Sequence, residues 1–129
     1  MNIALLEDNP SILDYLSTAL EMVGHSVHTF IESPSLYEAL FEEGSPRSPL
    51  PFDVLLVDLL LPGDISGLEA IRTIREDPST RHLPIIIVSA CSQNELEEVH
   101  KEFPDIPILR KPFKTQALLE QIEAVAPAG

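Results

Sequence analysis

Phe52-Asp53-Val54-Leu55-Leu56-Val57-Asp58 is the stretch that decides the fold, because it is an apolar run that ends on an acid. Three other short apolar runs, at residues 3–6, 85–88 and 106–109, also end at or near a polar or charged residue. Short apolar runs with helical patterns between them are typical of buried parallel strands. Ligands bind outside the carboxyl ends of the strands in open α/β sheets, so this edge is the expected site.

The chain alternates between strand patterns and helix patterns. The expected strands lie at residues 3–6, 27–31, 53–57, 85–88 and 106–109. A helix with one apolar face is expected after each of them, and the second strand is polar enough to lie near an edge of the sheet. Five strand–helix units predict one α/β domain, with a parallel sheet, right-handed crossovers and helices on both faces.

Local signals mark where helices begin and where regular structure is interrupted. Asn9 can cap the first helix, with Pro10 in its first turn. Ser92 and Glu95 have the spacing of a capping box, in which each side chain satisfies a free backbone N–H group of the other. Three prolines and a glycine within residues 44–51 predict a surface loop that contains neither strand nor helix.

Length and composition indicate an ordinary globular protein of 129 residues, 44% of them hydrophobic and 22% charged. We expect a single domain over residues 1–125, followed by a tail or truncated linker at 126–129. No apolar stretch approaches the roughly 20 residues of a membrane span, and the start lacks a basic region, so neither membrane segment nor signal peptide is expected. A single cysteine, Cys91, fits a reducing environment and predicts a cytoplasmic location.

The net charge of −13 argues against direct nucleic-acid binding, because a phosphate backbone requires a basic surface. Most of this charge is explained by solubility alone, so only a few acids are assigned to a site. The four histidines have no metal-site spacing with Cys91, and we expect them on the surface or in turns.

Glu7, Asp8 and Asp58 follow two of the apolar runs and would meet at one edge of the sheet. At ~4 Å and an effective dielectric constant near 20, each pair of charges repels by about 4 kcal/mol. Such a cluster raises its own pKa values or binds a cation, and an all-oxygen site suits Mg²⁺. Glu7 and Asp8 taken alone could equally be acids that favour the start of the first helix.

Ser89 and Lys111 follow two further strands and change the balance between these explanations. A hydroxyl, an ammonium group and a metal ion form an electrostatic cradle for a transferring phosphoryl group, with Asp58 as the nucleophile. Singly, the serine could be an ordinary strand-end hydroxyl and the lysine a surface charge. No other single chemistry uses all five residues.

These residues, in this order, resemble the receiver domain of two-component response regulators (CheY-like), over essentially the whole chain. The resemblance implies a flavodoxin-like (βα)5 fold with strand order 2-1-3-4-5. It implies that Glu7 and Asp8 hold Mg²⁺ and that Asp58 accepts a phosphoryl group from a sensor histidine kinase or phosphotransfer protein. Ser89 and Lys111, the latter in Lys-Pro-Phe, match the family's hydroxyl residue and lysine.

The loop after Asp58 also fits this family. The run Asp58-Leu59-Leu60-Leu61-Pro62, with Gly67 further on, is similar to the loop that follows the phosphorylated aspartate. By this resemblance the backbone carbonyl of Leu60 would be a further Mg²⁺ ligand. The implied role is signalling rather than enzymatic turnover: phosphorylation would change the surface around the last two helices and the last strand. A downstream output domain or protein would read that surface, from a monomer or a phosphorylation-dependent dimer.

Three features depart from the family pattern. The loop at residues 61–67 is one residue longer than the common one. Ile108 stands where an aromatic residue often swings inward on activation, and a buried isoleucine would not repeat that motion. Leu60 and Cys91 offer no group that could orient an attacking water, which predicts slow self-dephosphorylation.

Other functions fit the residues less well. A phosphatase of the haloacid dehalogenase type would require a second acid where Leu60 stands, and a flavin carrier would require a first loop that does not repel phosphate, as Glu7 and Asp8 would. A pseudo-receiver that binds partners without phosphorylation remains the alternative. A Mg²⁺-dependent response to acetyl phosphate or beryllofluoride would separate it from a phosphoacceptor.

Overall fold

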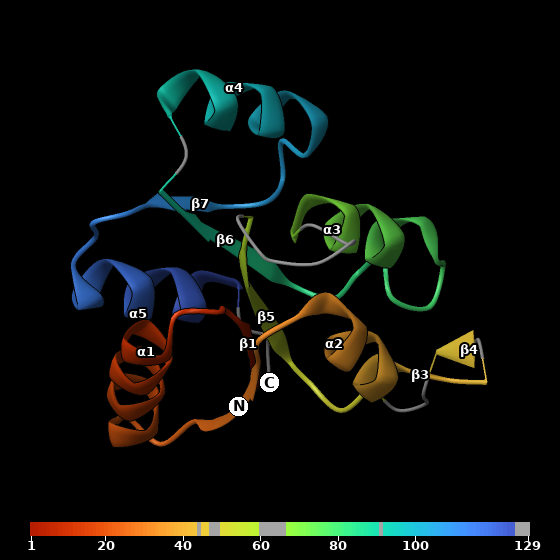
Figure 1. Cartoon of the computed structure of the whole chain (residues 1–129), viewed down its shortest axis with the longest axis horizontal. Coiled ribbons are helices and arrows are strands. Elements are labelled where there is room, and N and C mark those ends of the chain that lie inside the picture. Colours follow the sequence, from red (N-terminus) through yellow and green to blue (C-terminus); the bar gives the residue numbers. More distant parts are fainter. Residues whose placement is uncertain (44, 47–49, 60–66, 91, 126–129) are drawn as a thin grey trace.

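The computed structural model describes residues 1–43, 45–46, 50–59, 67–90 and 92–125. A five-stranded parallel sheet with strand order β2-β1-β5-β6-β7 forms its centre (Figure 1). The strands are β1 (Asn2–Leu6), β2 (Ser26–Phe30), β5 (Val54–Asp58), β6 (Ile85–Ser89) and β7 (Ile108–Arg110). With the short strands β3 and β4 set aside, this is the predicted order 2-1-3-4-5.

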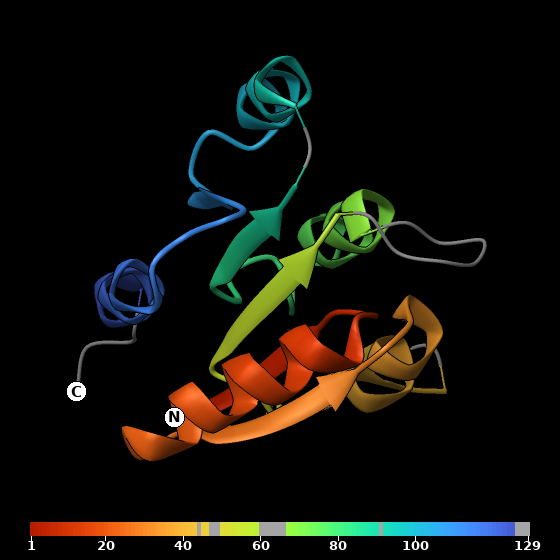
Figure 2. The ribbon, with the colours of Figure 1, turned by 60° about the vertical axis from the view of Figure 1, so that its left-hand side comes forward.

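Within the described residues, five helices cover the two faces of the sheet (Figures 1 and 2). They are α1 (Pro10–Met22), α2 (Ser33–Leu40), α3 (Gly67–Glu76), α4 (Gln93–Glu102) and α5 (Thr115–Val125). Apolar side chains of α1 and α5 pack on one face, and those of α2, α3 and α4 pack on the other. Because the central strands are covered on both faces, β5 and β6 are buried at every position, which explains their continuous apolar runs.

The predicted signals at the helix starts are largely confirmed. The Asn9 side chain accepts hydrogen bonds from the backbone N–H groups of Ser11 and Ile12, and Pro10 begins α1. The Ser92 hydroxyl accepts from the Glu95 backbone N–H at 3.3 Å, as predicted for a capping box. That hydroxyl also donates to the Glu95 carboxylate at 3.1 Å, so the two side chains contact each other directly.

Strand β2 lies at an edge of the sheet, as its polar sequence predicted, and most of it is exposed or partly buried. The prediction of a loop over residues 44–51 is wrong at Ser45–Pro46, which forms β4 and pairs antiparallel with β3 (Phe41–Glu42). Glu43, at the turn, has a positive φ of 52°. Two residues per strand are too few to produce a periodic sequence pattern, which is why the hairpin was missed.

The last strand begins two residues later than its apolar run. Ile106 is buried ahead of the strand, and the Pro107 carbonyl accepts a hydrogen bond from the Ile87 backbone N–H at 2.9 Å. The expectation that Ile108 is buried is wrong, because the side chain is only partly buried. The reason is its position in β7, an edge strand with a single neighbour.

Two further expectations concern the surface. His28, His82 and His100 are exposed, and His25 lies partly buried in the turn after α1, as expected. No helix in the described part of the chain is long and apolar enough to cross a membrane.

Candidate functional site

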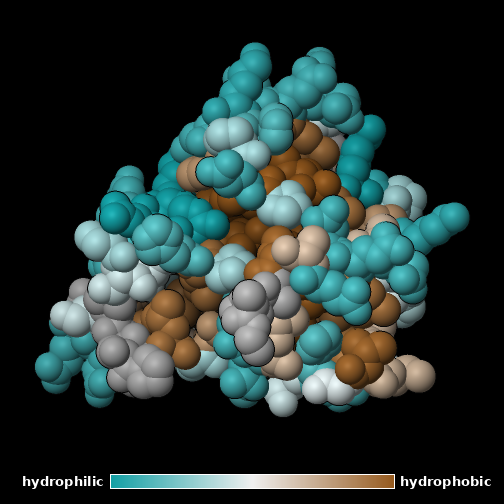
Figure 3. Space-filling view, turned by 180° about the vertical axis from the view of Figure 1, so that it is seen from behind, coloured by the Kyte–Doolittle hydropathy of each residue, from teal (hydrophilic) through white to brown (hydrophobic). Residues whose placement is uncertain are grey.

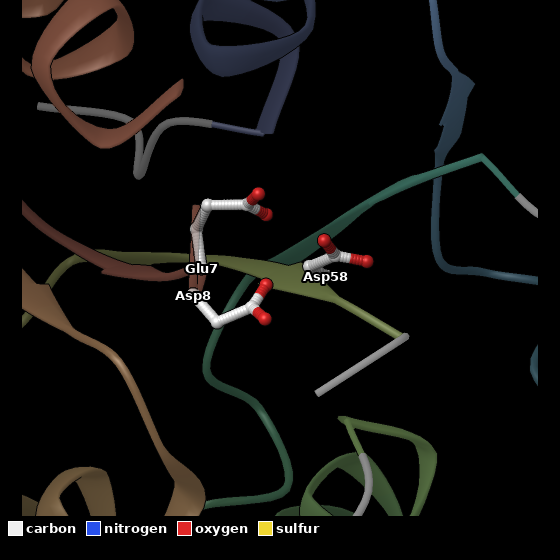
Figure 4. A group of neighbouring side chains, drawn as sticks. All are labelled: Glu7, Asp8 and Asp58. Atoms are coloured by element: carbon white, nitrogen blue, oxygen red, sulfur yellow. The ribbon is translucent and has the colours of Figure 1, made fainter. Parts of the chain in front are cut away.

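Three acids meet at the carboxyl end of the sheet. Glu7 and Asp8 follow β1 directly, and Asp58 is the last residue of the neighbouring strand β5. Carboxylate oxygens of the three residues lie within 4.8 Å of one another, and Figure 4 shows the carboxylates of Glu7 and Asp8 directed toward Asp58. The parallel register of β1 and β5 therefore produces the predicted cluster.

Lys111 binds two members of this cluster. Its Nζ lies 3.2 Å from each carboxylate oxygen of Glu7 and 3.0 Å from Oδ2 of Asp58. Its backbone N–H donates to the carbonyl of Ser89 at 2.7 Å, which extends the pairing between β6 and β7. The lysine is therefore held from its main chain while its side chain spans the two acids.

Ser89 is the last residue of β6 and is fully buried. Strand β6 pairs with β5 so that Val88 lies opposite Asp58, which places Ser89 at the same edge of the sheet. Two predicted features lie outside the described residues: the carbonyl of Leu60 and the side chain of Cys91. The longer loop falls there too, except for Gly67 at its end.

The electrostatics of the cluster follow from burial. Burial first, and then the hydrogen bond and charge of Asp58, raise the pKa of Glu7 from 4.5 to about 7 against the opposing effect of Lys111. Burial also acts to lower the pKa of Lys111, but the hydrogen bonds and charges of Asp58 and Glu7 outweigh it, so that this pKa lies above its usual value. The apposed acids therefore carry more negative charge than one lysine compensates.

Gly67 shows why α3 can begin so close to the site. A Cβ atom at this position would overlap the backbone carbonyl oxygen of Asp58 and lie 2.8 Å from the Cα atom of Leu59. Backbone atoms cannot move aside cheaply, so only glycine allows this approach. The sequence pointed to Gly67 as part of a motif but gave no reason for it.

The donor set fits a hard divalent cation. Three carboxylates from Glu7, Asp8 and Asp58 supply only oxygen ligands, and Asp8 is exposed where Glu7 and Asp58 are buried. The exposed side leaves room for water molecules, which Mg²⁺ characteristically keeps. Asp58 contributes to the raised pKa of Glu7 after burial, so the two acids disfavour each other's ionised form when no cation is bound.

Comparison with known proteins identifies the family. The family model for the response regulator receiver domain matches residues 3–123. The chain belongs to this family. The receiver domain is 33% identical to the response regulator receiver protein CpdR of Brucella abortus, over 94% of this chain and 92% of CpdR. It is 31% identical to the protein PilH of Pseudomonas aeruginosa, over 95% of each chain.

Other relatives are longer. The receiver domain is 32% identical to the phosphate regulon transcriptional regulatory protein PhoB of Rhizobium meliloti, but covers only 51% of that protein. Among solved structures, it is similar to the receiver domain of the sensor histidine kinase PA1611 from Pseudomonas aeruginosa, which has a magnesium ion coordinated in its active-site cleft. That structure has a TM-score of 0.78 and 26% identity, over 95% of this chain and 94% of that one. A putative response regulator from Chloroflexus aurantiacus has a TM-score of 0.82 at 22% identity, over 96% of this chain and 95% of that one, which shows the shared fold.

The molecule is therefore a receiver domain of two-component response regulators, a class of signalling modules. Phosphorylation and Mg²⁺ binding are general features of this family, whose members interact with histidine kinases and output domains.

One contact between α1 and α5 was not predicted. The hydroxyl groups of Tyr15 on α1 and Thr115 on α5 are hydrogen-bonded to each other. Residue Thr115 begins α5, so the bond joins α1 to the end of the segment that carries Lys111. The two residues are 100 positions apart, and no local sequence signal relates them.

Proposed function

We propose that this receiver domain accepts a phosphoryl group on Asp58 from a sensor histidine kinase or a phosphotransfer protein, and that Mg²⁺ is required. The observation that carries the proposal is the bridge of Lys111 between Glu7 and Asp58, next to an exposed Asp8. It combines a carboxylate nucleophile, a cation for phosphoryl oxygens and a set of oxygen ligands for a metal at one edge of the sheet.

In the proposed reaction an oxygen of Asp58 attacks the phosphorus of a phosphohistidine in line. The new oxygen–phosphorus bond forms as the phosphorus–nitrogen bond breaks, and the departing histidine nitrogen keeps the electron pair. Glu7, Asp8 and Asp58 would hold Mg²⁺, with the backbone carbonyl of Leu60 as a further ligand. The bound ion would neutralise charge on the phosphoryl oxygens during transfer.

The product would change the balance of charges around Lys111. The Asp58 carboxylate loses its own charge when the acyl phosphate forms, so the phosphoryl group adds about one net negative charge beside Glu7, which already has a raised pKa. The Lys111 ammonium and the Ser89 hydroxyl would bind the new oxygens. Movement of these two residues would alter the segments after β6 and β7, and thus the surface that a downstream domain or protein reads.

Replacement of the acceptor tests the assignment directly. Asp58→Asn, incubated with acetyl phosphate and Mg²⁺, should give no phosphorylated protein on a phosphate-affinity gel or by intact mass. Asp14→Asn on α1 removes the same charge from an exposed position and should be labelled like the wild type. Undiminished labelling of Asp58→Asn would refute the assignment.

The pseudo-receiver alternative finds no support in the comparisons. Beryllofluoride with Mg²⁺ should shift the amide resonances around Asp58, and Mg²⁺ withdrawal should reverse the shift.

Slow self-dephosphorylation stays a prediction, and a phosphoryl lifetime of seconds without a phosphatase would contradict it. The domain limits at 1–125, the tail at 126–129, the cytoplasmic location, the oligomeric state and the lack of nucleic-acid binding also stay predictions.

A further inference from the structure

Arg72 and Glu102 join α3 to α4 through a two-pronged ion pair. Nε of Arg72 lies 2.6 Å from Oε2 of Glu102, and Nη2 lies 2.7 Å from Oε1. Parallel contacts of this kind are the most specific form of arginine–carboxylate pairing. Glu102 holds the pKa of Arg72 above its ordinary value, and Arg72 holds the pKa of Glu102 below its own, so both groups are charged together.

Helix α4 has few other attachments to the domain. Leu96 and Val99 are its buried residues, and Phe103 is partly buried just after its end. Figures 1 and 2 show the helix at the top of the molecule, standing away from the sheet. An element with so little buried surface can shift at modest cost in free energy.

The flank of α4 that faces β7 is open. A cavity of about 650 Å³ lies there, lined by Leu96, Glu97 and His100 of α4 and by Ile106, Ile108 and Arg110 beside it. Figure 3 shows apolar surface gathered beneath α4. Helix α4 is therefore held by an ion pair on the side of α3 and borders open space on the side of β7.

Both clamped helices start next to the candidate site. Helix α3 begins at Gly67, which abuts the Asp58 carbonyl, and α4 begins at Gln93, four positions after Ser89. The ion pair thus joins the helix that follows Asp58 to the helix that follows Ser89. A displacement of either residue that moves α3 and α4 apart must therefore stretch or break the ion pair.

We propose that the Arg72–Glu102 pair is a latch that holds α4 in its unphosphorylated position and sets how readily phosphorylation of Asp58 moves the helix. The proposal rests on the proposed function and adds a regulatory element outside the chemical site. A ligand shifts an equilibrium only by its difference in affinity for the two states. An interaction made in the unphosphorylated state alone therefore lowers the apparent affinity for a phosphoryl mimic.

The experiment compares three variants with a matched control. Glu102→Gln, Arg72→Gln and the double variant each break the latch. Glu98→Gln removes the same charge from α4, but it breaks only a pair with Lys101 within that helix, at 3.3 Å. Each protein is titrated with beryllofluoride at saturating Mg²⁺ by calorimetry, and amide hydrogen exchange is followed across α4.

Each latch variant should bind beryllofluoride about three-fold more tightly than the wild type, since the pair is half-exposed (45% and 38%) and contributes modestly. The double variant should gain no more than the single ones, because all three lose one shared interaction. Amides of α4 should exchange faster in all three, and Glu98→Gln should match the wild type in both measurements.

Two results would overturn the latch: wild-type affinity in both single variants, or an equal change in Glu98→Gln, which would indicate a general effect of charge. Additive gains in the double variant would contradict it as well, because they would show that the two residues act separately. The failure of the proposed function looks different. In that case the wild type itself would not bind beryllofluoride in the presence of Mg²⁺.

Discussion

The cluster at the carboxyl end of the sheet and the α4 flank are held in contrasting ways. Glu7 and Asp58 are buried, lie at the carboxyl ends of adjacent strands and share one lysine. Helix α4 is attached by two buried side chains and a half-exposed ion pair, beside an open cavity. The first region is fixed by strand pairing, and the second by a few side chains.

This difference indicates where in the molecule substitutions are tolerated. Substitutions in the cluster act on buried charges and on backbone contacts, for which no alternative arrangement is available. Substitutions around α4 act on interactions that water and neighbouring side chains can partly replace. Effects on stability should therefore decrease from the strand ends toward the helix.

The largest effect is expected where α3 meets the cluster. Gly67→Ala should lower the free energy of unfolding by about 3 kcal/mol, because the added methyl group would overlap the Asp58 backbone. The displaced Asp58 should also be phosphorylated more slowly by acetyl phosphate. Urea denaturation and labelling kinetics measure the two effects.

Gly24→Ala is the control for this change. Gly24 has φ +96° and no atom within 4 Å of the added Cβ, so alanine there brings backbone strain without a clash. It should destabilise by about 1 kcal/mol and leave labelling of Asp58 unchanged. Equal losses of labelling in both variants would mean that Gly67 has no special relation to the site.

The next effect is a pH dependence that comes from Glu7. The folded-state pKa of about 7 exceeds the ordinary 4.5, so the folded protein holds a proton that the unfolded chain has released. Without Mg²⁺, the free energy of unfolding should therefore decrease by about 3 kcal/mol as the pH rises from below the lower to above the higher of these pKa values. Urea denaturation at a series of pH values measures the slope.

Glu7→Gln isolates this contribution, because the variant has no carboxylate at position 7. Its free energy of unfolding should therefore lack this part of the pH dependence. Mg²⁺ should also remove most of it in the wild type, since a bound cation favours the ionised carboxylates. If the wild type and Glu7→Gln had parallel pH profiles, Glu7 would not be the group that titrates.

The same contrast explains how far the sequence could predict the structure. Apolar runs at β1, β5 and β6 predict buried parallel strands, and parallel pairing then brings Glu7, Asp8, Asp58 and Ser89 to one edge. The meeting of these four residues was predictable because it depends only on strand order and on where each strand ends. The features that were missed depend on local three-dimensional contacts: the β3–β4 hairpin, the partial exposure of Ile108, and the packing of Gly67 against Asp58.

Contacts between surface residues that are far apart in the sequence could not be predicted either. Arg72 and Glu102 lie on exposed faces of α3 and α4, where charged residues are expected whether or not they pair. Their contact depends on how α4 lies against the sheet, and few apolar residues specify that. Sequence therefore predicts which side chains meet at the strand ends better than it predicts which exposed residues of two helices form a pair.

Ser89 lies between the two regions, and Ser89→Ala should have an intermediate effect. Loss of a hydroxyl that binds a phosphoryl oxygen should weaken beryllofluoride binding by about 1.5 kcal/mol, or roughly ten-fold. Asp58 should still be labelled by acetyl phosphate, because the nucleophile is intact. Calorimetry and labelling test these two expectations, and unchanged affinity would exclude Ser89 as a phosphoryl ligand.

The smallest effect is expected at Ile108, on the open side of α4. A phenylalanine has about 650 Å³ of adjacent space to enter, so Ile108→Phe should change the free energy of unfolding by less than about 1 kcal/mol. Ile86→Phe places the same ring in the fully buried centre of β6 and should cost about 3 kcal/mol. Urea denaturation of both variants measures the difference. Equal costs would mean that the α4 flank is packed as tightly as the sheet, and the contrast between the two regions would then be lost.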